Sequence, residues 1–93
     1  MTGQSSGVWV PRDIDYHPSF ESQAAAIERD THILDEKLLD LTFNIARVPE
    51  LYELHRRSGR LPLCAAYYLG NPRLRVWFTY DDHTVTLLGI ERV

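Results

Sequence analysis

The side chains best suited to chemistry are arginines in the second half of the chain. Residues 47–76 contain six arginines against two glutamates, whereas residues 1–46 contain eight acidic and three basic residues. The planar guanidinium group is always charged and can bind phosphate through two parallel hydrogen bonds. This half therefore predicts an anion-binding surface, although a solvated face or a set of salt bridges would look the same. The six residues are Arg47, Arg56, Arg57, Arg60, Arg73 and Arg75.

Proton transfer beside these arginines has five candidates: His55, Tyr67, Tyr68, His83 and Glu91. The cations that follow His55 would lower its pKa and leave a neutral imidazole able to act as a base. The simpler interpretations are that His55 ends a helix, His83 is an exposed turn residue, and Glu91 pairs with Arg92 or a neighbouring strand.

An aromatic ring lies next to one of the arginines on a predicted strand. Arg75, Trp77 and Thr79 alternate with apolar residues, so they should share the face opposite the core. Trp77 beside Arg75 suits the stacking of an unpaired base, or it is a partly buried core residue.

Composition limits the class of protein. Ninety-three residues of ordinary apolar content predict one domain over 1–93, with residues 1–7 flexible. The single cysteine, Cys64, lies in an apolar run and is expected to fill the core in a reducing cytoplasm. We predict no metal site, no cofactor and no membrane segment, because ligand pairs, a glycine-rich phosphate loop and long apolar runs are missing from the sequence.

The last third of the chain predicts the sheet. Three apolar runs, at 61–69, 74–80 and 84–90, are separated by the turn residues 70–72 and 81–83. Runs of this length separated by such turns indicate an antiparallel meander of three strands.

The first half predicts a strand and two helices. The strand lies at 8–10 or 14–16, and His17-Pro18-Ser19 prepares the first helix. Asp30 or Thr31 either caps a second helix or marks a bend. An apolar stripe should pack this second helix on the sheet. Pro49 should end the helix or begin a short turn, and three apolar or aromatic residues after Pro49 should close the core. The stripe is Leu34, Leu38, Leu41, Ile45 and Val48, and the closing residues are Leu51, Tyr52 and Leu54.

In this order of elements the chain resembles the RelE/ParE toxin superfamily. The segments that carry the resemblance are residues 16–20 (YHPSF), 45–49 (IARVP), 74–82 (LRVWFTYDD) and 84–90 (TVTLLGI). The resemblance implies an α+β fold, in which a strand and two helices pack on a mostly antiparallel sheet completed by the C-terminal meander.

The resemblance also implies a function, the toxin of a bacterial type II toxin–antitoxin pair that is neutralised by a cognate antitoxin. One branch of the family cuts mRNA in the ribosome and inhibits translation, without a metal. The ParE branch instead grips DNA gyrase without catalysis, and a fold of this kind can also serve as a non-toxic interaction module.

Site residues follow from the family pattern. Arg75 matches the family's strand arginine, with His55, Glu91 and His83 as catalytic candidates. RNA binding would fall to Arg56, Arg57, Arg60, Arg73 and Trp77. Two departures weigh against catalysis: almost no tail follows Glu91, and Ala65-Ala66-Tyr67-Tyr68 stands where many nuclease members have an arginine.

Overall fold

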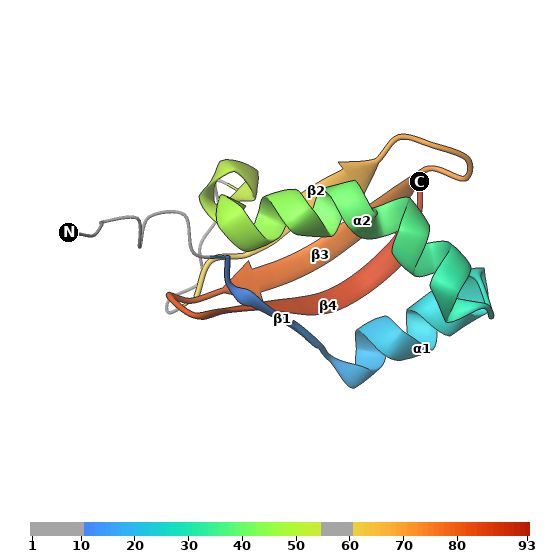
Figure 1. Cartoon of the computed structure of the whole chain (residues 1–93), viewed down its shortest axis with the longest axis horizontal. Coiled ribbons are helices and arrows are strands. Elements are labelled where there is room, and N and C mark those ends of the chain that lie inside the picture. The colour runs from blue at the N-terminus through green and yellow to red at the C-terminus, as the bar shows by residue number, and fades with distance from the viewer. Residues whose placement is uncertain (1–10, 55–60) are drawn as a thin grey trace.

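The computed structural model describes residues 11–54 and 61–93 as one α+β domain (Figure 1). Residues 1–7 and the candidate strand at 8–10 lie outside these ranges. The elements are β1 (Asp13–Tyr16), α1 (Pro18–Ile27), α2 (Thr31–Arg47), the 3-10 helix η2 (Pro49–Tyr52), β2 (Cys64–Tyr68), β3 (Leu74–Tyr80) and β4 (Thr84–Arg92). None of the helices in the described ranges is long and apolar enough to cross a membrane.

Both helices begin at the predicted caps. The His17 ring accepts a hydrogen bond from the backbone N–H of Ser19, and Asp30 accepts one from the backbone N–H of His32 at 2.9 Å. Such side chains bind N–H groups that the first helical turn leaves free. The second helix ends at Arg47, and Pro49 begins the short helix η2.

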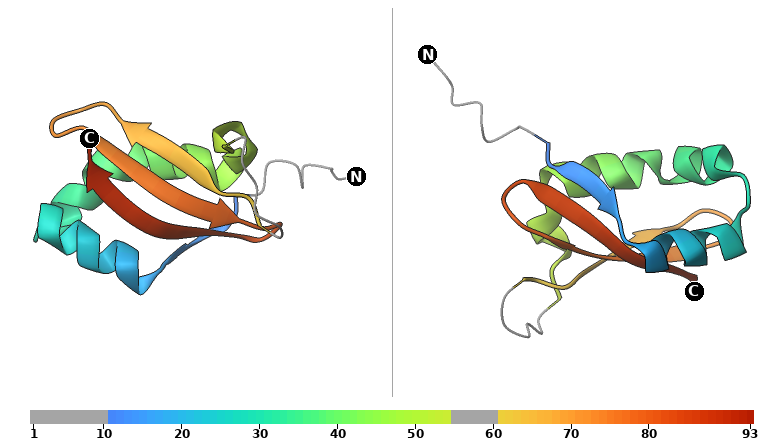
Figure 2. Two further views of the ribbon diagram at one scale, coloured as in Figure 1. Left: turned by 180° about the vertical axis from the view of Figure 1, so that it is seen from behind. Right: turned by 90° about the horizontal axis from the view of Figure 1, so that it is seen from below.

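The four strands form one mixed sheet in the order β1-β4-β3-β2. The predicted meander is confirmed, because β2 pairs antiparallel with β3 and β3 pairs antiparallel with β4. The first strand, β1, lies at the edge of the sheet beside the last strand, β4, and runs parallel to it. In Figures 1 and 2, α2 lies across one face of this sheet and α1 runs beside β4.

The core lies between α2 and the sheet. Leu34, Leu38 and Ile45 of the predicted stripe are buried, and Leu41 packs against them, which confirms the inward face of the helix. Cys64 is fully buried, as predicted for a small core residue. The sheet contributes Leu74, Val76, Phe78, Val85, Leu87 and Ile90.

A bulge in β4 changes which residues face the core. Phe78 pairs with Leu87, but its neighbour Trp77 pairs with Gly89, so Leu88 is an extra residue. An extra residue on one strand reverses the alternation that follows it. Leu87 is buried before the bulge and Ile90 after it, which leaves Glu91 on the face away from α2.

The edge of β4 beyond β1 is covered by polar side chains of α1. Ser19 Oγ donates to the Leu88 carbonyl at 2.5 Å, and the Ile90 backbone N–H donates to Gln23 Oε1 at 2.8 Å. These bonds occupy ladder groups that β1 is too short to reach.

Three predicted details are wrong. The first meander strand, β2, spans only Cys64–Tyr68 instead of 61–69. The last strand, β4, extends past residue 90 to Arg92, because its pairing with β3 continues to Leu74 and Arg92. Leu51 and Leu54 do not close the core, being 76% and 36% exposed, and of the three predicted residues only Tyr52, which the tight turn of η2 directs inward, packs against it.

Candidate functional site

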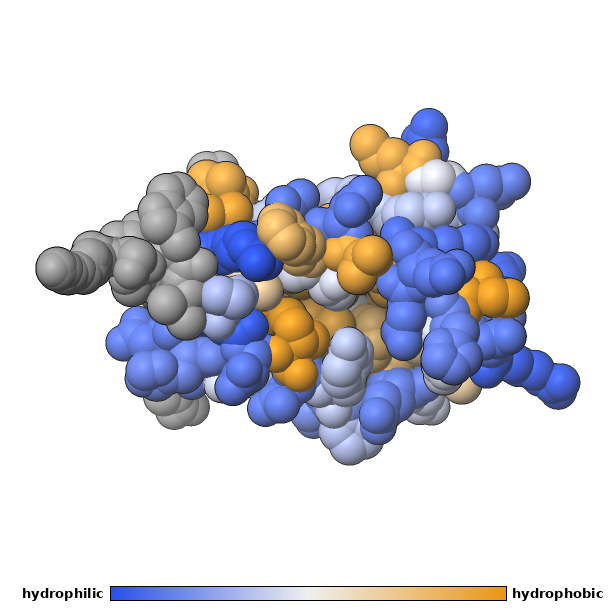
Figure 3. Space-filling view, in the orientation of Figure 1, coloured by the Kyte–Doolittle hydropathy of each residue, from blue (hydrophilic) through white to orange (hydrophobic). Residues whose placement is uncertain are grey.

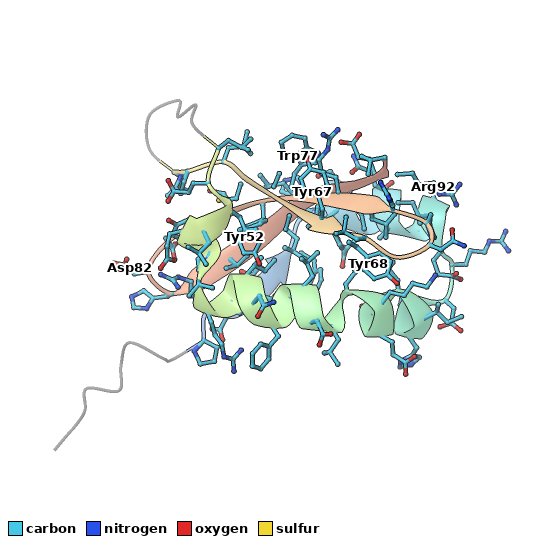
Figure 4. All side chains as sticks on the ribbon, turned by 90° about the horizontal axis from the view of Figure 1, so that it is seen from above. Tyr52, Tyr67, Tyr68, Trp77, Asp82 and Arg92 are labelled. Atoms are coloured by element: carbon cyan, nitrogen blue, oxygen red, sulfur yellow. The ribbon has the colours of Figure 1, made fainter. Side chains whose placement is uncertain are left out.

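Four side chains from three adjacent strands gather on the sheet face that α2 leaves uncovered. Tyr67 comes from β2, Arg75 and Trp77 from β3, and Glu91 from β4. Figure 4 shows Trp77 and Tyr67 on the side of the sheet away from α2. We call these four residues the open-face cluster.

A single carboxylate oxygen holds the cluster together. Glu91 Oε2 accepts hydrogen bonds from Arg75 Nε at 2.7 Å and from Trp77 Nε1 at 2.9 Å, and Arg75 Nη2 lies 2.6 Å from it. Arg75 Nη1 donates to the Tyr67 hydroxyl at 3.4 Å. The guanidinium carbon lies 4.9 Å from the centre of the Trp77 ring, within cation–π range. Arg75 is therefore fixed on three sides.

Both charges of the cluster are stabilised. The Trp77 N–H and then the Arg75 guanidinium lower the pKa of Glu91, and hydrogen bonds to Tyr67 and then Glu91 raise the pKa of Arg75. At neutral pH, Glu91 is a carboxylate that accepts hydrogen bonds rather than a proton donor. A lowered pKa also makes it a weak base.

The lowered pKa of Glu91 predicts a loss of stability in acid. The folded pKa is below the unfolded value of about 4.3, so the carboxylate stabilises the fold above that pH. This contribution is lost as the pH falls through the lowered folded pKa. Urea unfolding between pH 7 and pH 3 should show a smaller loss of unfolding free energy for Glu91→Gln than for wild type.

The matched control is Glu36→Gln, the same change at an exposed residue of α2. This variant should lose as much unfolding free energy in acid as wild type. Equal acid sensitivity of wild type and Glu91→Gln would contradict the prediction.

The other predicted site residues are not in the cluster. His83 lies in the β3–β4 turn, where Asp81 accepts bonds from the backbone N–H groups of His83 and Thr84, both at 2.8 Å. In Figure 4 the neighbouring Asp82 and the strand end at Arg92 lie at opposite ends of the sheet. Arg73 is exposed just before β3. His55, Arg56, Arg57 and Arg60 lie outside the described residues.

Two further candidates have different surroundings. Arg47 is on α2, with its guanidinium 3.5 Å from the centre of the Phe43 ring, so it does not join the cluster. Tyr68 packs against the core while Tyr67 is exposed, as the alternation predicts.

A hollow of about 450 Å³ adjoins Trp77 and Glu91. Sequence reasoning missed Gln23 and Gly89, which line it together with Leu88 and Ile90. The break in alternation at Leu87-Leu88-Gly89 is a sequence signal for a bulge there. Nothing in the sequence signals Gln23, because its place depends on how α1 packs along β4.

An apolar groove lies on the opposite side, between α1 and α2. It joins two hollows, of about 290 and 250 Å³, that share Tyr16, Phe20, Leu34 and Asp35. Apolar surface is visible in this hollow in Figure 3. Burial and then Asp35 raise the pKa of Tyr16. Its ionisable lining residues are acidic apart from Tyr16, so this groove does not suit phosphate.

The described residues contain no group of three His, Cys, Asp or Glu side chains that could hold a metal ion. No family model, no curated protein and no solved structure matches this chain.

Proposed function

We propose that this chain is a RelE/ParE-like toxin of a bacterial type II toxin–antitoxin pair that cuts ribosome-bound mRNA in the cytoplasm. The order strand, helix, helix and three strands supports the proposal. One observation carries it: Arg75 is held between Trp77 and Tyr67 on the sheet face opposite α2. Arginine beside aromatic rings suits RNA, because the cation binds phosphate and the rings stack unpaired bases.

Cleavage needs three functions at the scissile bond. The ribose 2′-hydroxyl must lose its proton, the phosphate must gain stabilisation as negative charge builds on it, and the leaving oxygen must be protonated. Arg75 stabilises the negative charge on the phosphate, since its guanidinium remains charged. In this proposal His55, beside Arg56, transfers protons, because Glu91 is a weak base. Arg57, Arg60 and Arg73 bind the RNA backbone.

The antitoxin in this proposal occupies the groove between α1 and α2. Tyr16 and Leu39, both exposed, offer apolar surface, and Glu21, Glu28 and Asp35 add negative charge. A groove of this kind suits an amphipathic segment with basic flanks.

A second candidate is a non-enzymatic toxin that binds DNA gyrase, as in the ParE branch. The observation that favours it is the Arg75–Glu91 ion pair, which neutralises the cation at the centre of the cluster. A binding surface tolerates this pair more readily than a catalytic one does, because phosphate must compete with Glu91 for Arg75.

Induced expression in a bacterium, with mapping of RNA 5′ ends across the transcriptome, tests the proposal. New ends within translated messages are expected with wild type and with the control Arg29→Ala, and they should be absent with Arg75→Ala. Growth arrest with intact RNA would favour the gyrase candidate. Unchanged growth with intact RNA would favour a non-toxic interaction module.

A further inference from the structure

The hollow beside Trp77 exists because a glycine faces the ring. Gly89 is the cross-strand partner of Trp77, so position 89 places no side chain beside the indole. A Cβ atom at position 89 would lie 2.9 Å from Gln23 Oε1. The strand glycine therefore leaves room both for Gln23 and for the space next to it.

Two polar groups of opposite kind line this hollow. Gln23 Oε1 accepts from the Ile90 N–H, which fixes the orientation of the amide and leaves its NH₂ group to donate. Glu91 uses Oε2 for Arg75 and Trp77, and Oε1 has no hydrogen-bond partner among the described residues. The hollow therefore combines an aromatic ring, an amide donor and an ionised acceptor.

We propose that this hollow binds one unstacked guanine of an RNA strand, next to the phosphate held by Arg75. Guanine presents two adjacent donors, N1–H and the N2 amino group, to the remaining oxygen of Glu91, Oε1, and its O6 accepts from Gln23. Adenine and cytosine place an acceptor beside a single donor group, and uracil flanks its only donor with acceptors, so a carboxylate repels part of each edge.

The position of Arg75 supports this assignment. Its guanidinium carbon lies over one face of the Trp77 ring, 4.9 Å from the centroid, so the cation is next to any base that the hollow at the flank of the indole would hold. The inference rests on the proposed function insofar as RNA is the ligand. Beyond that function, the guanine site would decide which RNA base binds beside the open-face cluster.

The test is fluorescence anisotropy of the full chain with labelled pentanucleotides UUGUU, UUAUU, UUCUU and UUUUU. Wild type is expected to bind UUGUU about fivefold or more tightly than the others. Inosine in place of guanine removes the N2 amino group and should weaken wild-type binding several-fold. Glu91→Gln should lose the preference for guanine and the sensitivity to inosine.

Glu36→Gln on α2 is the matched control and should keep both effects, and circular dichroism checks that each variant folds. Equal affinity for all four strands, or a preference for another base, would overturn the guanine site. In that case weaker binding by Arg75→Ala would still support RNA binding at the cluster. No binding of any strand by wild type would overturn the guanine site and the proposed RNA function together.

Discussion

Replacing Phe78 by alanine is expected to remove a large part of the free energy of unfolding. Phe78 is fully buried in the middle of β3, and its ring packs edge-on against Tyr52 with the centroids 6.0 Å apart. Truncating a buried phenylalanine costs about 3–5 kcal/mol, because it removes apolar burial and leaves a cavity. A domain of this size has about 5–15 kcal/mol in total. Urea unfolding of wild type and Phe78→Ala measures the difference.

Phe43→Ala is the matched control, since it makes the same truncation at a ring that is 54% exposed on α2. It removes the contact with Arg47 and should cost about 1 kcal/mol or less. Similar losses at the two positions would show that the core does not centre on β3.

Arg75→Ala is expected to weaken binding of single-stranded RNA about tenfold or more at moderate salt. The change removes the cation proposed to bind phosphate and leaves Glu91 as an unpaired negative charge on the same face. Loss of one good phosphate contact together with this repulsion is worth at least about 1.4 kcal/mol. Anisotropy titrations at several salt concentrations measure both the affinity and its salt dependence.

The fold should survive this change, because an exposed ion pair contributes about 1 kcal/mol or less. Arg75→Lys keeps the charge but loses the planar fork, so its affinity should lie between wild type and alanine. The double variant Arg75→Ala/Glu91→Gln separates the lost contact from the repulsion and should recover part of the affinity. Unchanged RNA binding by folded Arg75→Ala would remove the residue from the proposed site.

Local sequence signals predicted most of the elements. The caps at His17 and Asp30 and the proline at 49 mark where helices begin and end, and β3 matches its apolar run. These signals succeed because they depend on neighbouring residues alone. The alternation in β3 also placed Arg75 and Trp77 on one face, which are half of the open-face cluster.

The rest of the cluster depends on pairing between distant residues. Glu91 reaches Arg75 only because the bulge reverses the alternation of β4, and Gln23 reaches the hollow only through the packing of α1. Neither the register of two strands nor the angle of a helix is encoded within one short segment. The parallel pairing of β1 with β4 also joins segments about seventy residues apart.

The extra residue in β4 also makes this strand tolerant of shortening. In a regular strand, losing one residue turns every later side chain to the opposite face. Without Leu88, however, Phe78 and Trp77 would still pair with Leu87 and Gly89, now in an unbroken ladder. Ile90 would remain in the core, and Glu91 would remain opposite Arg75. A gene copy missing that single codon would therefore keep the polar groups of the open-face cluster, and would lose the Leu88 side chain at the hollow and the bond from Ser19 to the Leu88 carbonyl.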